Sequence, residues 1–203
     1  MYDATKRFSL KADRKSHIIQ DLGLETKKYI LSTVHRAENT DRKERLYKIF
    51  SALRKLSEQW PVVIPLHPRT QKMLLQFNME YVLEGLIVLK PSGFLDMLSL
   101  EKNALLITTD SGRVQKESYF QRVPCVTLRD ETEWVETIES GWNVLTNVDS
   151  IEAIVETILA SIGFSAGRSD IDQYGDGRTS YRIRQIVEDF LSGKGKDISL
   201  LHD

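Results

Sequence analysis

The stretch LLITTDSGRVQKESY, residues 105–119, joins an apolar run to a helix-forming run through Asp-Ser-Gly. Its first five residues are apolar or β-branched, a composition typical of a buried strand. Asp110 and Ser111 are residue types that favour the position just ahead of a helix. The stretch therefore predicts a strand, a tight turn and a helix, the repeating unit of a parallel sheet covered by helices.

The same alternation runs along most of the chain. Strands are predicted at residues 27–34, 61–67, 85–90, 104–109, 124–128 and 143–148. Helices are predicted at residues 42–60, 69–79, 93–103, 111–122, 131–140, 150–162 and 179–192. The strands are almost continuously apolar, as expected when helices cover both faces of a sheet. The predicted fold class is α/β, a Rossmann-like doubly wound parallel sheet over residues 26–203, preceded by a charged connecting arm or helix at residues 1–25.

Composition excludes several classes of protein. The 203 residues are 41% apolar and 28% charged with a net charge of −1, so neither a nucleic-acid nor a membrane partner is expected. The start lacks the apolar core of a signal peptide, and no apolar run approaches the roughly 20 residues of a membrane span. One cysteine, Cys125, allows no internal disulfide and suits a cytoplasmic location. The four histidines and Cys125 lack metal-ligand spacing, so no metal and no other cofactor is predicted.

A binding site is predicted where the strands end, because ligands of a doubly wound sheet bind outside the carboxyl ends of its strands. Taken alone, His35 and His67 are better explained as loop histidines held by backbone carbonyls. Their grouping with other polar residues favours a site. The residues that follow successive strands are His35, Arg36 and Glu38; His67; Ser92; Asp110, Ser111 and Gly112; and, in the fifth loop, the run that includes Trp134.

The junction at Ser111 suits an anion. The first N–H groups of a helix and its positive dipole end bind phosphate, and Gly112 lets a ligand approach the backbone closely. Glu117, less than two turns further on, is placed to accept hydrogen bonds from sugar hydroxyls beside that phosphate. The junction therefore predicts a phosphorylated sugar or a nucleotide. The structural alternative is that Asp110 or Ser111 only caps the helix.

Five motifs occur in an order that resembles one enzyme family: STVHRAENTD (32–41), LHPRT (66–70), TTDSGRVQKES (108–118), VPCVTLRDETEWVE (123–136) and YGDGRTSYRI (174–183). Over nearly its whole length, the chain resembles the C-terminal half of the non-hydrolysing UDP-N-acetylglucosamine 2-epimerases. The resemblance implies the GT-B arrangement, two Rossmann-like domains with the active site in the cleft between them. This chain is then expected to be the second, nucleotide-binding domain, without the first.

The family inverts C2 of UDP-GlcNAc to give UDP-ManNAc by eliminating UDP and adding it back. The resemblance implies that His35 contacts the diphosphate or assists catalysis, and that Glu117 binds the ribose hydroxyls. Ser111 and Gly112 are expected to hold phosphate. The loop that carries Ser92 and Met97 is expected to border the uracil. The residues implied at the UDP-binding site are Arg36, Glu38, His67, Ser92, Met97, Ser111, Gly112, Arg113, Glu117 and Trp134.

The resemblance also implies what this chain lacks. The acid–base carboxylates of the family, and an Arg and a Lys that contact phosphate, lie mostly in the N-terminal domain. The implied partners are a UDP-sugar substrate and either a second copy in a homodimer or a separate N-terminal domain.

Departures from the family pattern leave alternatives open. Arg113 stands where the family usually has a second glycine, so it can contact a phosphate or block it. Arg113 also lies four residues before Glu117, and the two can pair along the helix for about 0.3 kcal/mol. Trp134 replaces an arginine and, taken alone, is better explained by packing. These departures at Arg113 and Trp134 resemble epimerases that act on UDP-diacetamido-glucuronate. Two further alternatives for the chain are a non-catalytic nucleotide-sugar-binding remnant and a glycosyltransferase.

Overall fold

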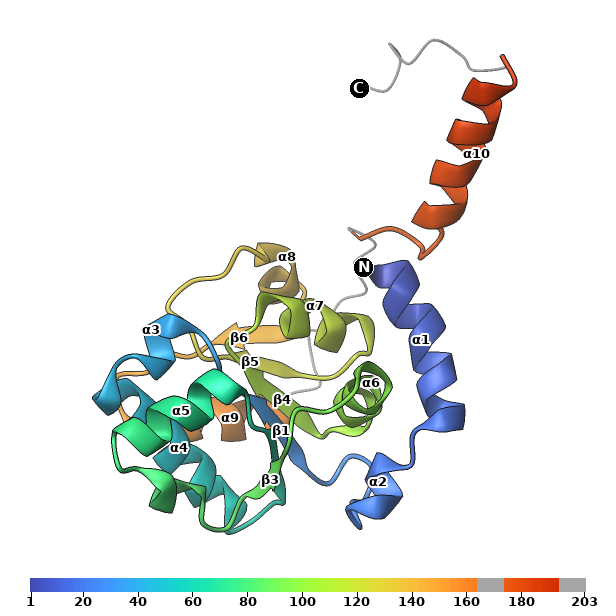
Figure 1. Ribbon diagram of the computed structural model, residues 1–203. Helices are drawn as coiled ribbons and strands as arrows, with labels where there is room; N and C mark the ends of the chain where they lie inside the picture. Colours follow the sequence, from blue (N-terminus) through green and yellow to red (C-terminus); the bar gives the residue numbers. More distant parts are fainter. Residues whose placement is uncertain (164–173, 194–203) are drawn as a thin grey trace.

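One parallel sheet organises the computed structural model, which describes residues 1–163 and 174–193 (Figure 1). Within those residues six strands pair in the order β3-β2-β1-β4-β5-β6, and every pair is parallel. This is the strand order of doubly wound Rossmann-like sheets, so the predicted fold class is confirmed. The strands are β1 Ile30–Thr33, β2 Val62–Pro65, β3 Ile87–Leu89, β4 Leu106–Thr109, β5 Cys125–Thr127 and β6 Asn143–Leu145.

Helices precede the sheet and connect its strands. In the described residues they are α1 Tyr2–Lys15, α2 Ile18–Asp21, α3 Ala37–Thr40, α4 Lys43–Ser57, α5 Pro68–Gln76, the 3-10 turn η1 Glu80–Leu83, α6 Phe94–Asn103, α7 Gly112–Phe120, α8 Val135–Glu139, α9 Ile151–Gly163 and α10 Thr179–Leu191. The short elements α3 and η1 were not predicted, because a single turn carries too little apolar periodicity.

The helix predicted from residue 131 was wrong at its start, since α8 begins only at Val135. Thr132 Oγ1 donates to Gln115 Oε1 at 2.6 Å, and the backbone N–H of Trp134 donates to Thr132 Oγ1 at 3.1 Å. This local side-chain to backbone bond competes with helical hydrogen bonding. Residues 132–134 therefore stay outside the helix and turn toward α7.

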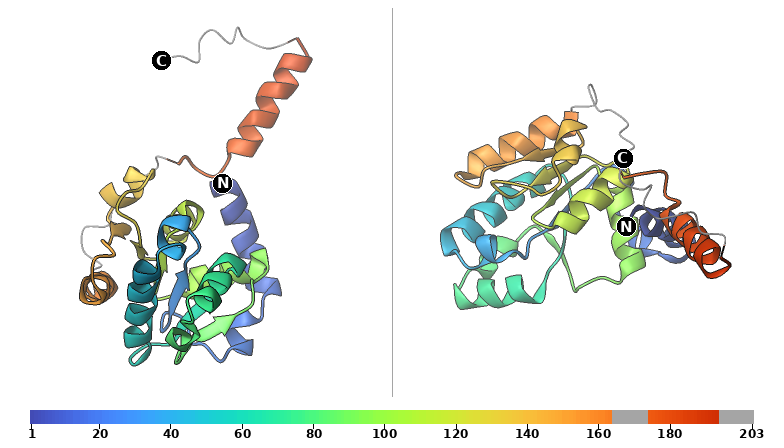
Figure 2. Two further views of the ribbon diagram at one scale, coloured as in Figure 1. Left: turned by 60° about the vertical axis from the view of Figure 1, so that its left-hand side comes forward. Right: turned by 90° about the horizontal axis from the view of Figure 1, so that it is seen from above.

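Two apolar layers cover the sheet, one on each face (Figure 2). Successive side chains of a strand point to opposite faces, so Ile30 packs with α4, α5 and α9 while Leu31 packs with α6 and α7. Each fully buried Leu, Ile or Phe contributes about 1.5–3 kcal/mol relative to an exposed one. The core therefore holds the strand ends, and the loops that follow them, in a fixed relation.

The segment predicted as a connecting arm or helix forms α1 and α2. Thr5 and Ala12 of α1 are buried, and Ser16 Oγ at its end donates to Asp96 Oδ1 of α6 at 2.6 Å. Ile18 and Ile19 of α2 pack against the second apolar layer. The boundary at residue 25 stays a prediction, but α1 is attached to the body of the domain along α6 and α7 (Figure 1).

Helix α10 extends away from the sheet (Figure 1). Every residue from 179 to 193 is exposed. Near its start, the backbone N–H and the hydroxyl of Ser180 donate to Asp3 Oδ2 at 2.7 and 2.9 Å. Among the described residues, none of the helices combines the length and apolar character needed to cross a bilayer.

The strand order reverses between β1 and β4. From β1 the chain builds outward to β2 and β3, then returns to place β4 on the other side of β1. The loops after β1 and β4 therefore leave toward opposite faces of the sheet. Ligands of such sheets bind at this switch point, outside the carboxyl ends of the two strands.

Candidate functional site

A buried carboxylate joins the two loops at the switch point. Asp110 directly follows β4 and is fully buried. Its oxygens accept hydrogen bonds from the backbone N–H of His35 at 2.9 and 3.0 Å and from that of Arg36 at 2.9 Å. Asn39 Nδ2 of α3 donates to Asp110 Oδ2 at 3.0 Å. Asp110 therefore fixes the loop after β1. It does not cap α7, which was one of the two roles that the sequence left open for it.

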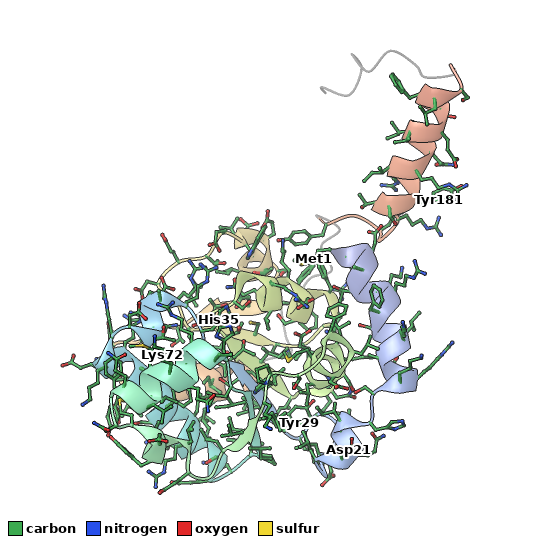
Figure 3. The ribbon with its side chains drawn as sticks, in the orientation of Figure 1. Met1, Asp21, Tyr29, His35, Lys72 and Tyr181 are labelled. Carbon is green, nitrogen blue, oxygen red and sulfur yellow. The ribbon has the colours of Figure 1, made fainter. Side chains whose placement is uncertain are left out.

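His35 lies beside α3 at the carboxyl end of β1, and Tyr29 marks the opposite end of that strand (Figure 3). His35 Nδ1 is 3.3 Å from Asp110 Oδ1, and its ring centroid is 5.2 Å from that of His67. Partial burial, with smaller effects of His67 and Arg36, lowers the pKa of His35 despite the opposing charge of Asp110. A neutral imidazole can accept as well as donate a hydrogen bond.

His67 holds the start of α5. Its Nδ1 accepts from the backbone N–H of Arg69 at 3.1 Å, and Arg69 in turn pairs with Asp41 at 2.6 Å. The structure thus brings His67 next to His35 and gives it a capping role. Because His67 follows β2, its ring lies at the same edge of the sheet as His35.

Ser111 and Gly112 form the N-terminus of α7. Ser111 Oγ accepts from the backbone N–H of Val114 at 3.5 Å, so the capping alternative is confirmed for Ser111. Gly112 has no room for a side chain: a Cβ there would lie 2.8 Å from Trp134 Nε1 and 3.7 Å from Arg36 Nη2. Three donors, the Gly112 backbone, the indole N–H and the guanidinium, therefore converge on one place at the positive end of a helix.

Trp134 arrives at Gly112 from the loop after β5. Its Nε1 is buried without a hydrogen-bond partner. Lys116 Nζ of α7 lies 3.4 Å from the centre of its ring, a cation–π contact that fixes the indole. A buried donor without a partner is costly, so an acceptor placed beside this N–H would be stabilising.

Arg113 and Glu117 pair along α7, as their spacing predicted. Arg113 Nε donates to both carboxylate oxygens of Glu117 at 3.0 Å. The guanidinium also stacks on the ring of Phe94 at 5.0 Å. The Glu117 side chain is only 3% exposed, whereas that of Arg113 is 54% exposed. Burial raises the pKa of Glu117, against the lowering effect of Arg113.

A second ion-pair group borders the site. Arg129, which follows β5, donates to Glu38 Oε1 at 3.0 Å and to Glu133 Oε2 at 2.9 Å. Arg36 Nη2 is 3.8 Å from Glu133 Oε1. Glu38, expected at the UDP site, is thus tied to Arg129 across the switch point. Its contact with a ligand stays a prediction.

The residues expected to border a base lie further along the edge. Ser92 Oγ donates to Lys90 O at 3.5 Å, and Met97 packs against the second apolar layer. Phe94 connects this loop to the switch point, because its ring packs against the Arg113 guanidinium. The structure therefore brings together His35, His67, Arg36, Ser111, Gly112 and Trp134, and places Ser92 and Met97 in a neighbouring loop.

Sequence reasoning placed Asp110 at this edge of the sheet but gave no sign of its bond to Asn39. It missed three residues of the site: Asn39, which lies in a quoted motif, Arg129 in the fifth loop and Glu101. Glu101 of α6 is buried against Glu117. Its only signal was its position three residues after Leu98 on the buried face of a helix. In the described parts of the chain, no three His, Cys, Asp or Glu side chains gather in a way that could hold a metal ion.

The fold and site together define a Rossmann-like α/β domain whose polar residues gather at the switch point of a doubly wound sheet. A protein-family model described as UDP-N-acetylglucosamine 2-epimerase matches residues 1–188. The chain belongs to this family, as the motifs predicted.

Known relatives are about twice as long as this chain. A UDP-N-acetylglucosamine 2-epimerase homolog of Methanococcus maripaludis is 42% identical over 92% of this chain and 52% of its own length. The UDP-2,3-diacetamido-2,3-dideoxy-D-glucuronate 2-epimerase of Pseudomonas aeruginosa is 42% identical over 78% of this chain and 44% of its own length. A solved structure, Methanocaldococcus jannaschii UDP-GlcNAc 2-epimerase in complex with UDP-GlcNAc and UDP, is 35% identical and covers 92% of this chain and 52% of its own, with a TM-score of 0.82. The chain spans about half the length of the curated relatives it matches.

Proposed function

We propose that this chain is the nucleotide-binding C-terminal half of a UDP-N-acetylglucosamine 2-epimerase. The observation that carries the proposal is the convergence of the α7 N-terminus, the unpartnered Trp134 indole N–H and the Arg36 guanidinium at Gly112. These donors suit a diphosphate. The structural similarity to a relative that was solved with UDP-GlcNAc and UDP supports the same ligand here.

Each part of UDP has a proposed partner. The backbone of Ser111 and Gly112 holds phosphate, with Arg36 and Trp134 donating beside it. His35 and His67 face the departing diphosphate as hydrogen-bond donors. Glu117 accepts from the ribose hydroxyls, and the loop with Ser92 and Met97 borders the uracil. Glu38 supports the site through Arg129.

The proposed reaction inverts C2 in two steps. A base removes the C2 proton while the C1–O bond breaks, which leaves a glycal and UDP. UDP then adds back to C1 as C2 receives a proton on the opposite face. Negative charge builds on the leaving diphosphate, so preorganised donors at Gly112 lower that barrier. The acid–base carboxylates come from the other half of the family fold.

The partner is a proposal as well. Either two copies associate as a homodimer, or a separate N-terminal domain pairs with this chain; a longer chain of which these residues are part can also supply that domain. The proposed location is the cytoplasm, where the buried Cys125 stays reduced; burial raises its pKa to about 12, so the thiol does not ionise.

Arg113 must move for Glu117 to reach ribose. The guanidinium is half-exposed and is held by one ion pair and one ring, so it can turn outward when the ribose hydroxyls take over its hydrogen bonds to Glu117. We predict that Arg113→Ala strengthens UDP binding about threefold, because the pair no longer competes with ribose. Calorimetric titration with UDP checks this, with Arg182→Ala, an exposed arginine on α10, as the control. Weaker binding by Arg113→Ala would instead show that the guanidinium contacts phosphate.

The central test is binding without turnover. The purified chain should bind UDP in calorimetry, and Glu117→Gln should weaken that binding by about tenfold. Glu44→Gln, the same change at an exposed position of α4, should leave it unchanged. The chain alone should not convert UDP-GlcNAc to UDP-ManNAc. No UDP binding would refute the proposed site, and appreciable turnover would refute the need for another half.

A second substrate is favoured by one observation. Arg113 is a half-exposed cation beside the site, and such a group suits the carboxylate of a glucuronate sugar. The Pseudomonas aeruginosa relative that acts on a diacetamido-glucuronate is as similar in identity as the Methanococcus homolog. Competition between the two UDP-sugars for the chain, repeated with Arg113→Ala, distinguishes them: only the glucuronate should lose affinity.

A further inference from the structure

Glu101 is a buried acid that the proposed function does not use. It lies on α6 and is 1% exposed, facing Glu117 of α7, which is 2% exposed. The two carboxyl groups lie close enough for each to influence the pKa of the other. Gln121 Nε2 donates to Glu101 Oε2 at 3.0 Å, and Arg113 Nε holds the far side of Glu117. The four side chains form one row between the protein interior and the surface.

The charges around the two carboxyl groups decide how many of them are ionised. Two adjacent buried carboxylates do not both ionise readily, because each raises the pKa of the other. The groups that face the pair are Arg113 from α7, the neutral Tyr29 ahead of β1 and the neutral Cys125 of β5. From α1, Ser9 reaches only Gln121 Oε1, at 3.4 Å. In the described part of the chain, Arg113 is the cation beside the pair, and it balances one of the two carboxylates.

The retained proton belongs to Glu101. Burial, and next the charge of Glu117, raise the pKa of Glu101 well above the ordinary value. Glu117 lies nearer to Arg113, which lowers its pKa. A protonated Glu101 donates to Glu117 through its hydroxyl and accepts from Gln121 through its carbonyl oxygen. Both carboxyl groups and the Gln121 amide of the row then have partners.

We propose that Glu101 is a positioning residue for nucleotide binding: packed against Glu117 and held by Gln121, it donates a hydrogen bond that fixes the Glu117 carboxylate for the pentose hydroxyls. The proposal rests on the proposed function, which assigns Glu117 to the pentose. Glu101 occupies one lone pair of a carboxylate that offers about four. The outward lone pairs, held by Arg113 in the free protein, are left for the diol of the sugar.

The proposal has a consequence for pH. The competent state carries one proton on the pair. At lower pH Glu117 is protonated as well, and its carboxylate is lost as an acceptor for the sugar. At higher pH both groups are ionised and repel each other. UDP affinity should therefore pass through a maximum with pH, and its acid limb should lie above the ordinary glutamate value of 4.5 because burial raises the pKa of Glu117.

The test compares two replacements of Glu101 in the full 203-residue chain. Glu101→Gln keeps the donor to Glu117 and the acceptor for Gln121 but cannot ionise. It should bind UDP within about twofold of the unaltered chain at neutral pH and lose the alkaline limb. Glu101→Met keeps the volume without the donor, and should bind UDP about tenfold more weakly. Neither variant should alter binding of 2′,3′-dideoxy-UDP, which lacks the diol.

Two outcomes overturn the proposal. One is that both variants bind UDP with the affinity and pH profile of the unaltered chain. The other is that carbon-13 NMR of labelled glutamate shows Glu101 ionising near the ordinary glutamate value. If Glu101→Met does not fold, Glu101→Gln and the NMR titration still decide. If the unaltered chain binds no UDP at any pH, the proposed function fails, while NMR reports separately on the shared proton.

Discussion

At the scale of single residues, Gly112 is the most constrained position of the site. The space that a Cβ would need is occupied by the indole nitrogen of Trp134, 2.8 Å away. The contact between Gly112 and the fifth loop is fixed further by Lys116, whose Nζ lies 3.4 Å from the centre of the Trp134 ring.

Gly112→Ala tests this close approach. The new methyl group must displace the indole from the helix N-terminus, so UDP affinity should fall at least tenfold, while the free energy of unfolding falls by about 1–2 kcal/mol. Calorimetry with UDP and urea unfolding measure the two effects.

The matched control is a double variant. Trp134→Phe removes the atom that the methyl group meets, so Gly112→Ala added to Trp134→Phe should cost little further stability. If Gly112→Ala alone binds UDP like the unaltered chain, no ligand approaches the backbone at this position.

At the scale of elements, Asp110 decides how β1, α3 and β4 meet. Backbone N–H groups of His35 and Arg36 and the amide of Asn39 all donate to it. Asn39 extends the connection, since its Nδ2 also donates to Leu128 O after β5, and its Oδ1 accepts from Arg45 of α4 at 2.7 Å. Three loops of the sheet edge thus depend on one carboxylate.

Asp110→Asn should lower the free energy of unfolding by about 3 kcal/mol, because the amide offers one acceptor and turns a donor toward backbone N–H groups. Urea unfolding at neutral pH gives the value. Asp130→Asn is a suitable control, since Asp130 lies in the same part of the chain but is exposed and pairs only with Arg45. Equal stability of Asp110→Asn and the unaltered chain would contradict the anchoring role.

At the scale of the whole molecule, the two ends of the described chain are attached differently. Helix α1 packs along α6 and α7, with Tyr2 stacked on Phe120 at 4.7 Å between ring centroids. Helix α10 touches the body through Ser180 and Asp3. Its apolar side chains, such as Ile183, Ile186 and Phe190, are more than half exposed.

Removal of residues 179–203 should therefore change the free energy of unfolding of the domain by less than about 0.5 kcal/mol. Removal of residues 1–15 should cost several times as much, since it uncovers α6 and α7. Urea unfolding of the two shortened chains gives the comparison. A large loss in the first variant would show that α10 packs on the body in solution.

The sequence by itself determined the strand–helix alternation, the parallel sheet and the order of the motifs, because apolar periodicity and turn residues act over short stretches. It also determined the Arg113–Glu117 pair, whose partners are one helical turn apart. Only the tertiary structure decided that Asp110 serves the loop after β1, that Trp134 closes on Gly112 and that Glu101 meets Glu117. Each of these contacts joins different elements, and its geometry depends on how the packed layers set the distance between them, which no local pattern encodes.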